Sequence, residues 1–549
     1  MKRLSGIILF LSFLVVCEET SGKVRQEGVD EETACVCHQT ADICIYGATS
    51  AGIISAYTAA KMGKKVVLLE PSSHVGGMST GGLGLTDIGK IDIVKGYAMD
   101  FYNRLGTYYG KDESVFVFEP KAADAVFKTY LNEVGLHVCK NYRLSSVKKQ
   151  HGCIKSITLH HHPSGGKLTV SAKVFIDCTY EGDLMAMSGV NYAVGREGND
   201  VYGETFNGVQ LLNQHQFPDG VDPYVERGNP NSGLLYGISN QPVGKAGSGN
   251  KDIQAYNYRI TLTNDSSNRI PITCPDNYDP SRYELLIRMR DKWQWNDLNQ
   301  IFIWSHIPNH KTDINNRGGF STDVIGENYG YPEGTWEERE RIVKRHLDYT
   351  KGLLYFVGHD QRIPVSIRQE MLKWGYPKDE YLQSGHFTPQ LYIREARRMK
   401  GRTIMTQAHC QSKVTVADTI GWAAYTMDSH NCGRYVVNGM VKNEGNVEEP
   451  IDRSYAISYG AITPLEKEAK NLLVPVCLSA SHIAYGSIRM EPVFMLLGET
   501  AVLAACQAID CHKSVVQKVD SRAVMQQFRQ MHKNDRFKLS NNKRDDLLL

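Results

Sequence analysis

Short apolar runs alternate with polar and glycine-rich stretches over the first 180 residues of the chain. Residues 43–46 and 66–69 are two such runs, the second predicted strand starting at Lys65, and the stretch between them is rich in Ala and Ser. Uninterrupted apolar runs of this length are typical of strands that are buried in a parallel sheet. The pattern therefore predicts a strand, a helix and a second strand in a parallel β-α-β unit.

The same patterns predict further elements along the chain. Pro492 is suited to be the first residue of a helix, where its missing N–H has no intrahelical acceptor to lose. The predicted helices are 121–134 and 493–506, and the predicted strands lie within 135–149, 153–161, 167–176, 174–177 and 472–476. Strands and helices that alternate in this way are typical of an α/β fold.

The turn after the first strand has the spacing of a dinucleotide-binding fingerprint. Gly47, Thr49 and Gly52 occupy the three glycine positions of G-x-G-x-x-G. The first glycine permits the tight turn, and the third lets the helix pack close to the strand. The helix then begins at Ser50 and Ala51, where free N–H groups favour an anion such as a pyrophosphate.

Two features after this turn distinguish NAD from FAD. Glu70 ends the second strand 18 residues after Gly52, where a carboxylate can bind both hydroxyls of an adenosine ribose. Residues 71–87 (PSSHVGGMSTGGLGLTD) then carry five glycines, and such a backbone can lie against a large flat ligand. An NAD domain would normally continue into a third strand, so this loop favours FAD.

With these residues, the chain resembles the secreted or periplasmic branch of the FAD-dependent oxidoreductases. This branch is distantly similar to glutathione-reductase-type flavoproteins, and some of its members are labelled xanthan lyase. Residues 174–183 resemble the family's D-A-T-G-D-G-D-L stretch, with Gly182 and Asp183 matching and Cys178, Tyr180 and Glu181 departing. Residues 310–334, 389–401 and 471–506 also resemble family stretches.

The resemblance implies an α/β fold with a Rossmann-like FAD-binding domain of the glutathione-reductase type, interleaved with a mixed α+β substrate domain. It implies that the helix after Pro492 directs its N-terminus at the flavin, where a positive end stabilises the reduced anion. The implied cofactor-binding residues are Gly47, Thr49, Ser50, Ala51, Gly52, Glu70, Pro71, His74, Gly76, Gly77, Met78, Gly82, Gly182, Asp183, Arg489, Met490, Glu491 and Pro492.

The N-terminus predicts export. Lys2 and Arg3 precede the apolar run 7–16, which is too short to span a bilayer, and this is the pattern of a signal peptide. The protein is therefore expected to be secreted or periplasmic, where disulfides can form among its 13 cysteines. The predicted organisation is 1–22 signal peptide, 23–40 flexible arm, 41–200 first part of the FAD domain, 201–400 substrate domain, 401–530 return to the FAD domain and 531–549 polar tail.

The net charge and the positions of the aromatic residues indicate which classes of partner and substrate to expect. The net charge is +2 with both signs intermixed, so neither nucleic acid nor an anionic membrane surface is an expected partner. No segment after the leader has the pattern of a membrane span. All six tryptophans lie between Trp293 and Trp422, which is consistent either with a sugar-like substrate or with a Trp-rich core. Residues 310–334 are expected to form a long loop.

Arginines and histidines supply the candidate catalytic groups. Arg394, Arg397 and Arg398 would share a face if 389–401 were a helix, and could bind a substrate carboxylate or join two domains. Hydride removal from a hydroxyl-bearing carbon needs a base. His482 is the first candidate and His430 the second.

Two more residues near the expected flavin could take part in the chemistry. Arg489 adds positive charge near the expected flavin. His74 precedes the Gly76–Gly77 pair, much like the histidine that carries FAD covalently in succinate-dehydrogenase-type proteins. No spacing typical of a metal site is present.

These features predict an exported FAD-dependent oxidoreductase. It would remove a hydride from a small polar, sugar-like substrate and pass electrons to O2 or a quinone-like acceptor, since NAD is scarce outside the cell. The alternatives are a flavin-containing carbohydrate-processing lyase and a flavin-binding protein without turnover.

Overall fold

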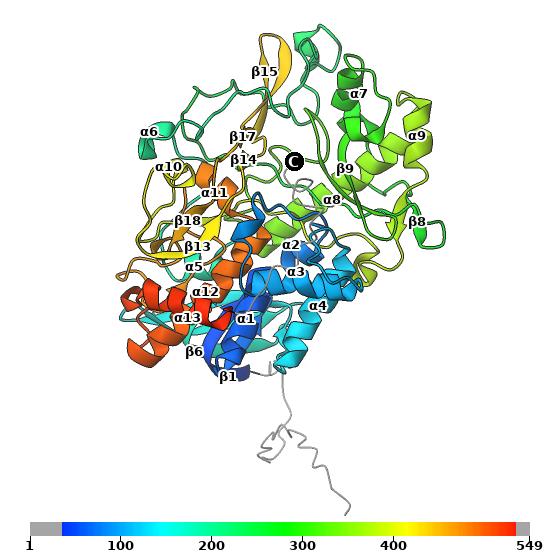
Figure 1. The fold of residues 1–549 in the computed structure, drawn as a ribbon. Helices are drawn as coiled ribbons and strands as arrows, with labels where there is room; N and C mark the ends of the chain where they lie inside the picture. Colours follow the sequence, from blue (N-terminus) through cyan, green and yellow to red (C-terminus); the bar gives the residue numbers. More distant parts are fainter. Residues whose placement is uncertain (1–35, 534–549) are drawn as a thin grey trace, which may run out of the picture. The chain divides into compact units, whose positions relative to one another are not determined.

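A seven-stranded sheet organises the described part of the chain, residues 36–533, in this computed structural model (Figure 1). Four strands run in the order β3-β2-β1-β6, and β19 pairs with the end of β6. These five strands are β1 (Val36–Tyr46), β2 (Val66–Leu69), β3 (Val138–Cys139), β6 (Lys167–Asp177) and β19 (Leu472–Leu473). All their pairings are parallel, as the sequence predicts, although β19 is shorter than the predicted 472–476.

An antiparallel hairpin extends the sheet beyond β6. It consists of β4 (Tyr142–Gln150) and β5 (Cys153–His161), and β5 pairs with the first half of β6. β6 therefore has two partners on the same edge, β5 along its beginning and β19 along its end. The predicted strands 153–161 and 167–176 are confirmed.

The two faces of the sheet bury different sets of side chains. Ile43 and Ile45 of β1 pack into a core formed largely by helices, whereas Cys44 and Tyr46 face the opposite core with Leu159. Because successive strand residues point to opposite faces, four consecutive apolar residues are needed when both faces are covered. This explains the uninterrupted apolar run at 43–46.

Helices pack on one face of this sheet. They are α1 (Ser50–Lys61), α3 (Tyr97–Tyr108), α4 (Pro120–Glu133), α12 (Glu491–Cys511) and α13 (Ser521–Met531), of which α1 and α12 lie side by side (Figure 1). Gly498 permits this approach, since a Cβ there would lie 2.7 Å from the carbonyl oxygen of Ala51. Among the described residues, α12 alone has the length and composition of a membrane span, but 89% of its apolar window is buried in the fold.

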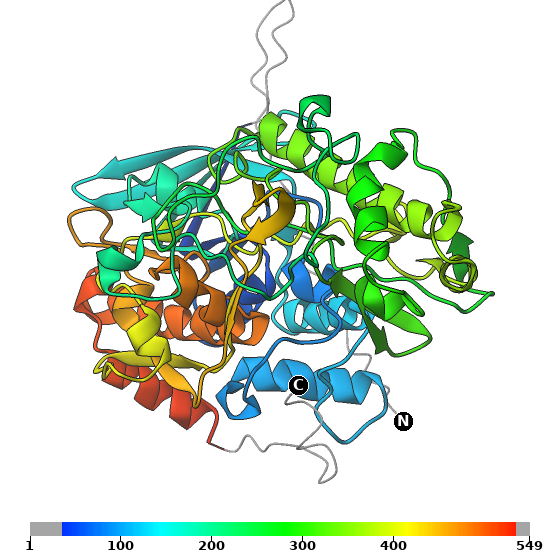
Figure 2. The ribbon, with the colours of Figure 1, turned by 90° about the horizontal axis from the view of Figure 1, so that it is seen from above.

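The segment between residues 201 and 400 has small sheets, three helices and long irregular stretches. The strands pair as β9 (Phe302–Ile307) with β10 (Lys311–Asn316) and β8 (Arg269–Pro271) with β11 (Gly375–Pro377), and the helices are α7 (Glu284–Arg290), α8 (Trp336–His359) and α9 (Val365–Met371). These elements, coloured green, group together in Figure 2. The predicted loop 310–334 is a loop only after β10.

Residues 401–470 form three further strand pairs. They are β13 (Thr419–Ala423) with β18 (Tyr455–Ser458), β14 (Met427–Ser429) with β17 (Val447–Glu449), and β15 (Gly433–Val437) with β16 (Met440–Glu444). β14 lies against α11 (His482–Ile488), where a Cβ on Gly486 would lie 2.2 Å from the carbonyl oxygen of Asp428. The remaining elements are α2 (Gly77–Thr80), α5 (Asp183–Met187), α6 (Asn199–Tyr202), α10 (Gln407–Cys410), β7 (Tyr192–Ala193) and β12 (Arg398–Met399).

Two expectations from the sequence are corrected. Residues 389–401 do not form a helix, because β12 pairs with β7 and the three arginines of the segment bond to different parts of the chain. The N-terminal arm does not reach residue 40, since β1 begins at Val36 and pairs with β6 from there. The signal peptide and the final residues 534–549 lie outside the described residues.

The boundaries of the predicted domains stay predictions, as does the expectation of disulfides. All eleven cysteines within residues 36–533 carry free thiols. Cys17 and Cys35 lie outside the described residues.

Candidate active site

The turn after β1 has no room for side chains at its first and third glycine positions. Gly47 has φ +100°, and a Cβ on it would lie 2.7 Å from the backbone of Cys178. A Cβ on Gly52 would lie only 1.8 Å from the carbonyl oxygen of Gly47. Thr49 caps α1, accepting from the Gly52 N–H at 3.3 Å and donating to the Cys178 carbonyl at 2.8 Å. The turn therefore has the predicted shape, and the Thr49 hydroxyl serves as a helix cap.

Glu70 lies over this turn at the end of β2, immediately before Pro71. One carboxylate oxygen accepts from the Ala48 N–H at 2.8 Å, and the other accepts from the N–H and hydroxyl of Ser72 at 2.9 and 2.7 Å. Burial raises the pKa of Glu70 to about 7. The predicted ribose-binding carboxylate is thus beside the turn and held in place by three hydrogen bonds.

A buried carboxylate connects the starts of α1 and α12. Glu491 accepts from the hydroxyls of Ser50 and Tyr180, the latter at 2.7 Å. Burial raises the pKa of Glu491 above its ordinary value. Tyr180 also accepts from the Met78 N–H at 3.0 Å, so one network joins both helix starts to the glycine loop. Met490 is the N-cap residue of α12, and Pro492 follows Glu491 as the second residue of the helix.

Sequence reasoning did not assign Tyr180 to the site. Its hydroxyl occupies the space in front of Gly77, where a Cβ would lie 2.2 Å from the Tyr180 oxygen. The signal was the tyrosine itself, which departs from the glycine of the D-A-T-G-D-G-D-L stretch that residues 174–183 resemble. Gly76 and Gly77 have φ of +99° and +57°, and Gly82 has φ +114° with its Cβ position 2.1 Å from the Arg259 carbonyl oxygen.

His74 points back onto this loop. Its Nε2 lies 3.0 Å from the Gly77 carbonyl oxygen and 3.0 Å from the Thr80 hydroxyl. Burial lowers the pKa of His74, which favours a neutral ring that donates from Nε2 to the carbonyl. Covalent attachment of a flavin at His74 stays a hypothesis.

Asp183, a predicted cofactor-binding residue, is bonded to two arginines. It pairs with Arg339 at 2.6 and 2.9 Å and with Arg397 at 2.6 Å, just after Gly182. Burial alone would raise the pKa of Asp183, but the two arginines outweigh burial and hold it below its ordinary value. Arg398 pairs with Glu197 at 2.8 Å and Glu395 at 2.6 Å. Arg397 and Arg398 therefore join segments of the protein.

Charged side chains gather at the start of α12. Arg489 donates to Asp428 at 2.6 Å and to the Tyr392 hydroxyl at 2.9 Å. Arg394 lies 3.0 Å from Asp323, and its guanidinium and that of Arg489 both face the Tyr392 ring. We call this group the charged cluster; its members are Asp87, Arg259, Asp313, Asp323, Tyr392, Arg394, Asp428, His430 and Arg489.

Arg259 and two carboxylates complete the charged cluster. Its guanidinium binds Asp313 through two hydrogen bonds of 2.7 and 2.6 Å, and Asp87 lies 3.5 Å away. Asp87 is the last residue of the glycine-rich stretch 71–87. Burial raises the pKa of Asp87, with Arg259 and Arg489 acting in the opposite direction.

His430 is held by one ring nitrogen. Its Nδ1 lies 2.6 Å from Asp323, and its Nε2 lies 3.8 Å from Asp428, beyond hydrogen-bond distance. An aspartate that accepts from Nδ1 leaves Nε2 of a neutral ring as an acceptor. The side chain is 13% exposed. The hydrogen-bonded partner of His430 is therefore Asp323, and Asp428 is the more distant carboxylate.

His482 has both ring nitrogens engaged. Nδ1 lies 2.7 Å from Glu395 and Nε2 lies 3.0 Å from the Ser429 hydroxyl, in a fully buried position. Burial disfavours the ionised form of Glu395, but His482 and Arg398 outweigh it and lower the pKa of Glu395 to about 2. His482 thus sits behind His430, against the preceding residue Ser429. This arrangement favours His430 as the residue that faces a substrate.

The family model of the FAD dependent oxidoreductases matches residues 42–530. The chain belongs to this family. It is an FAD-dependent oxidoreductase, and FAD is its cofactor.

Similarity to solved structures is low. The OxyS anhydrotetracycline hydroxylase from Streptomyces rimosus matches with 11% identity and a TM-score of 0.23, over 33% of this chain and 36% of that one. The 3-ketosteroid-delta4-(5alpha)-dehydrogenase from Rhodococcus jostii RHA1 matches with 12% identity and a TM-score of 0.19, over 27% and 48%. Thermovibrio ammonificans THI4 matches with 17% identity and a TM-score of 0.23, over 29% and 66%. No curated protein matches the sequence.

The residues of this oxidoreductase fit FAD. The glycine positions of the turn keep the start of α1 free of side chains, and the first N–H groups of a helix have no intrahelical acceptor. Glu70 presents a carboxylate beside this turn, and Nε of Arg489 is buried without a partner among the described residues. Bound there, FAD supplies a two-electron acceptor.

A second group of acids in the oxidoreductase encloses a lysine. Carboxylate oxygens of Glu119, Asp379 and Glu380 lie close enough together to hold a cation. The Lys311 ammonium occupies that position, 2.7 to 2.8 Å from all three. We call this group the lysine-centred acid cluster; it joins the start of α4 to the segment 311–380.

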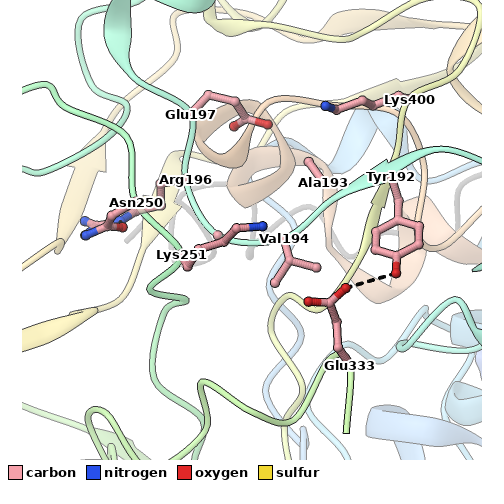
Figure 3. Close-up of a pocket in the computed structure, with 10 residues that line it drawn as sticks. Tyr192, Ala193, Val194, Arg196, Glu197, Asn250, Lys251, Glu333 and Lys400 are labelled. Atoms are coloured by element: carbon pink, nitrogen blue, oxygen red, sulfur yellow. Dashed lines mark hydrogen bonds between the residues drawn. The ribbon is translucent and has the colours of Figure 1, made fainter.

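Two cavities have linings that include no member of the charged cluster. One, of about 490 Å³, is lined by His215, Trp293, Trp295, Gln300, Ile303, Arg317 and Gly318, and the His215 ring lies 6.3 Å from that of His430. The other, of about 440 Å³, has Lys251, Lys400 and Glu197 around it, with Tyr192 donating to Glu333 at 3.0 Å (Figure 3).

Proposed function

We propose that this FAD-dependent oxidoreductase oxidises a small, polar, hydroxyl-bearing substrate. A carbon–hydrogen bond would break with its electron pair leaving as hydride for the flavin, while the hydroxyl proton leaves for a base and a carbonyl forms. The electrons would pass on to O2 or a quinone-like acceptor.

The arrangement of His430 carries this proposal. Asp323 accepts from Nδ1 at 2.6 Å, which fixes the tautomer and leaves Nε2 open to receive a proton. Asp428 of β14 lies 3.8 Å from Nε2 and binds Arg489, the C-cap residue of α11, two residues before α12. A base next to the start of α12 is where the resemblance to flavoproteins expects the flavin to react.

The cavity beside His215 supports a sugar-like substrate. Trp295, Trp304 and Trp374 are at least 93% buried and serve the core, whereas Trp293 is 45% exposed and lines this cavity. The indole N–H of Trp295, also at the cavity, has no acceptor among the described residues. An exposed aromatic face with a free donor suits a polar ring.

The same proposal includes the type of FAD-binding domain and the export of the protein. The strand order β3-β2-β1-β6-β19 with a β4–β5 hairpin supports a glutathione-reductase-type FAD domain, interleaved with a substrate domain at 201–400. The N-terminal apolar run supports export.

The test is anaerobic reduction of the bound flavin by neutral sugars and polyols. The rate is measured as the loss of flavin absorbance in a stopped-flow instrument. His430→Gln should slow reduction by about 100- to 10,000-fold without loss of FAD, because the proton acceptor is gone. His137→Gln, at an exposed position, is the matched control and should leave the rate unchanged. A His430→Gln rate within threefold of the wild type would remove His430 as the base. Failure of every neutral sugar and polyol to reduce the flavin would remove the substrate class.

A further inference from the structure

We infer that the charged cluster selects uncharged, hydroxyl-bearing substrates against carboxylic acids, and that Asp87 sets this preference. The inference rests on the proposed function and names the charge class of its substrate.

Each guanidinium of the charged cluster already has a carboxylate of its own. Arg259 holds Asp313 at 2.6 Å, Arg394 lies 3.0 Å from Asp323, and Arg489 holds Asp428 at 2.6 Å. Asp87 is the fourth carboxylate, and its distance to Arg259 is 3.5 Å. Three cations against four carboxylates leave one surplus negative charge while His430 is neutral.

Asp87 is also the carboxylate with the most open side. Its side chain is 26% exposed, compared with 16% for Asp428, 2% for Asp323 and 0% for Asp313. It ends the glycine-rich stretch 71–87, which the resemblance to flavoproteins expects along FAD. The surplus charge of the cluster is therefore on its most exposed carboxylate.

An acidic substrate meets two obstacles in this arrangement. Inside the charged cluster, bidentate binding of a carboxylate requires a guanidinium that is free, and freeing one would leave a buried aspartate without its partner. Arg397 and Arg398, the other arginines of the 389–401 segment, bond to Asp183 and Glu197. Asp87 adds direct repulsion at short range.

A hydroxyl-bearing substrate meets the opposite situation. Its hydroxyl can donate to the Asp87 carboxylate, and its proton can pass to Nε2 of His430. The imidazolium formed in that step carries one positive charge, which the surplus carboxylate balances. The same residue thus disfavours an acid and stabilises the protonated base.

Sulfite tests the local charge without any substrate, because this anion adds to oxidised flavin and bleaches its visible absorption. In the holoenzyme, Asp87→Asn should tighten sulfite binding about tenfold, since one negative charge is removed near the flavin. Asp87→Glu, which keeps the charge, and Asp276→Asn, at an exposed position, should match the wild type. Equal sulfite affinity in Asp87→Asn and the wild type would overturn the inference.

Matched pairs of a sugar and its uronic acid test the selectivity. The wild type should be reduced at least tenfold more efficiently by the sugar, and Asp87→Asn should bring the ratio below threefold. A wild type that prefers the acid, or a ratio unchanged in Asp87→Asn, would overturn the inference while leaving the proposed function standing. If sulfite responds as expected but no sugar reduces the flavin, the proposed function fails and the charge assignment stands.

Discussion

The turn at residues 46–70 and the charged cluster are built in opposite ways. The turn uses one continuous segment whose fit is steric, with Cβ positions on Gly47 and Gly52 blocked by nearby backbone. The charged cluster draws on residues from 87 to 489 and is held by ion pairs between segments that are distant in sequence. A local steric site depends on which residues are small, whereas a dispersed electrostatic site depends on which residues become neighbours.

The largest effect is expected from Gly52→Val, which attacks the local site. A Cβ at this position would lie 1.8 Å from the Gly47 carbonyl oxygen, so the turn cannot close around the start of α1. The purified variant should contain no FAD and take up none when FAD is added, measured by visible absorbance. Gly166→Ala is the control, because the nearest atoms to its Cβ lie at 3.8 Å. Near-normal FAD content in Gly52→Val would show that the turn is not the cofactor site.

Lys311→Met tests the lysine-centred acid cluster, which joins the start of α4 to the segment 311–380. Removing this ammonium leaves Glu119, Asp379 and Glu380 facing one another without their central cation. The free energy of unfolding in urea should fall by about 3–5 kcal/mol, as for the loss of one partner from a buried ion pair. Lys344 pairs with Asp348 at the surface, so Lys344→Met should lower the free energy of unfolding by less than about 1 kcal/mol. Similar losses of stability in both variants would show that the lysine-centred acid cluster does not depend on its buried cation.

Local sequence patterns predicted the elements of the turn region well, but they did not predict all of its contacts. The strand, the turn, α1 and Glu70 follow from apolar runs and glycine spacing within one segment. The predicted helix 121–134 is α4 (Pro120–Glu133), and the predicted 493–506 is the longer α12. The pairing of Tyr180 with Gly77 could not be predicted, because a tyrosine that fills the space before a glycine 103 residues away leaves no local pattern.

The second region shows what the sequence leaves undetermined. The residues were identified, but their partners were not: Arg394 could bind a substrate or join segments, and only the fold pairs it with Asp323. His482 precedes α12 in sequence and so was the first candidate base, yet Glu395 and Ser429 engage both of its nitrogens. Long-range ion pairs depend on loop packing, which has no periodicity to read.

Asp323→Asn tests whether the dispersed site works as a unit. Without the carboxylate on Nδ1, His430 loses the group that fixes its tautomer and stabilises its protonated form. The rate of flavin reduction should fall about 100-fold, and FAD content should not change. Asp276→Asn, exposed and remote, is the control. A loss of FAD along with the loss of rate would mean that the two regions are not separable.

The smallest effect is expected at Glu70, where FAD binding should depend on pH through a group of the turn region alone. Burial raises its pKa to about 7 in the protein without cofactor, so the fraction of ionised Glu70 increases as pH rises through 7. Ribose hydroxyls donate to the ionised carboxylate, and FAD binding below pH 7 must therefore release a proton. The dissociation constant for FAD should fall by up to about tenfold per pH unit between pH 5.5 and 7 and then level off.

Glu70→Gln should abolish this dependence, because its amide does not titrate, and should bind FAD about tenfold more weakly at pH 8, where the wild-type carboxylate is ionised. Fluorescence quenching of added FAD measures both constants. Asp87→Asn serves as the comparison from the other region, since it changes the charge of the charged cluster and leaves Glu70 and its hydrogen bonds intact. If Asp87→Asn also flattened the profile, the titrating group would belong to the charged cluster, and the separation between a steric cofactor site and an electrostatic substrate site would fail.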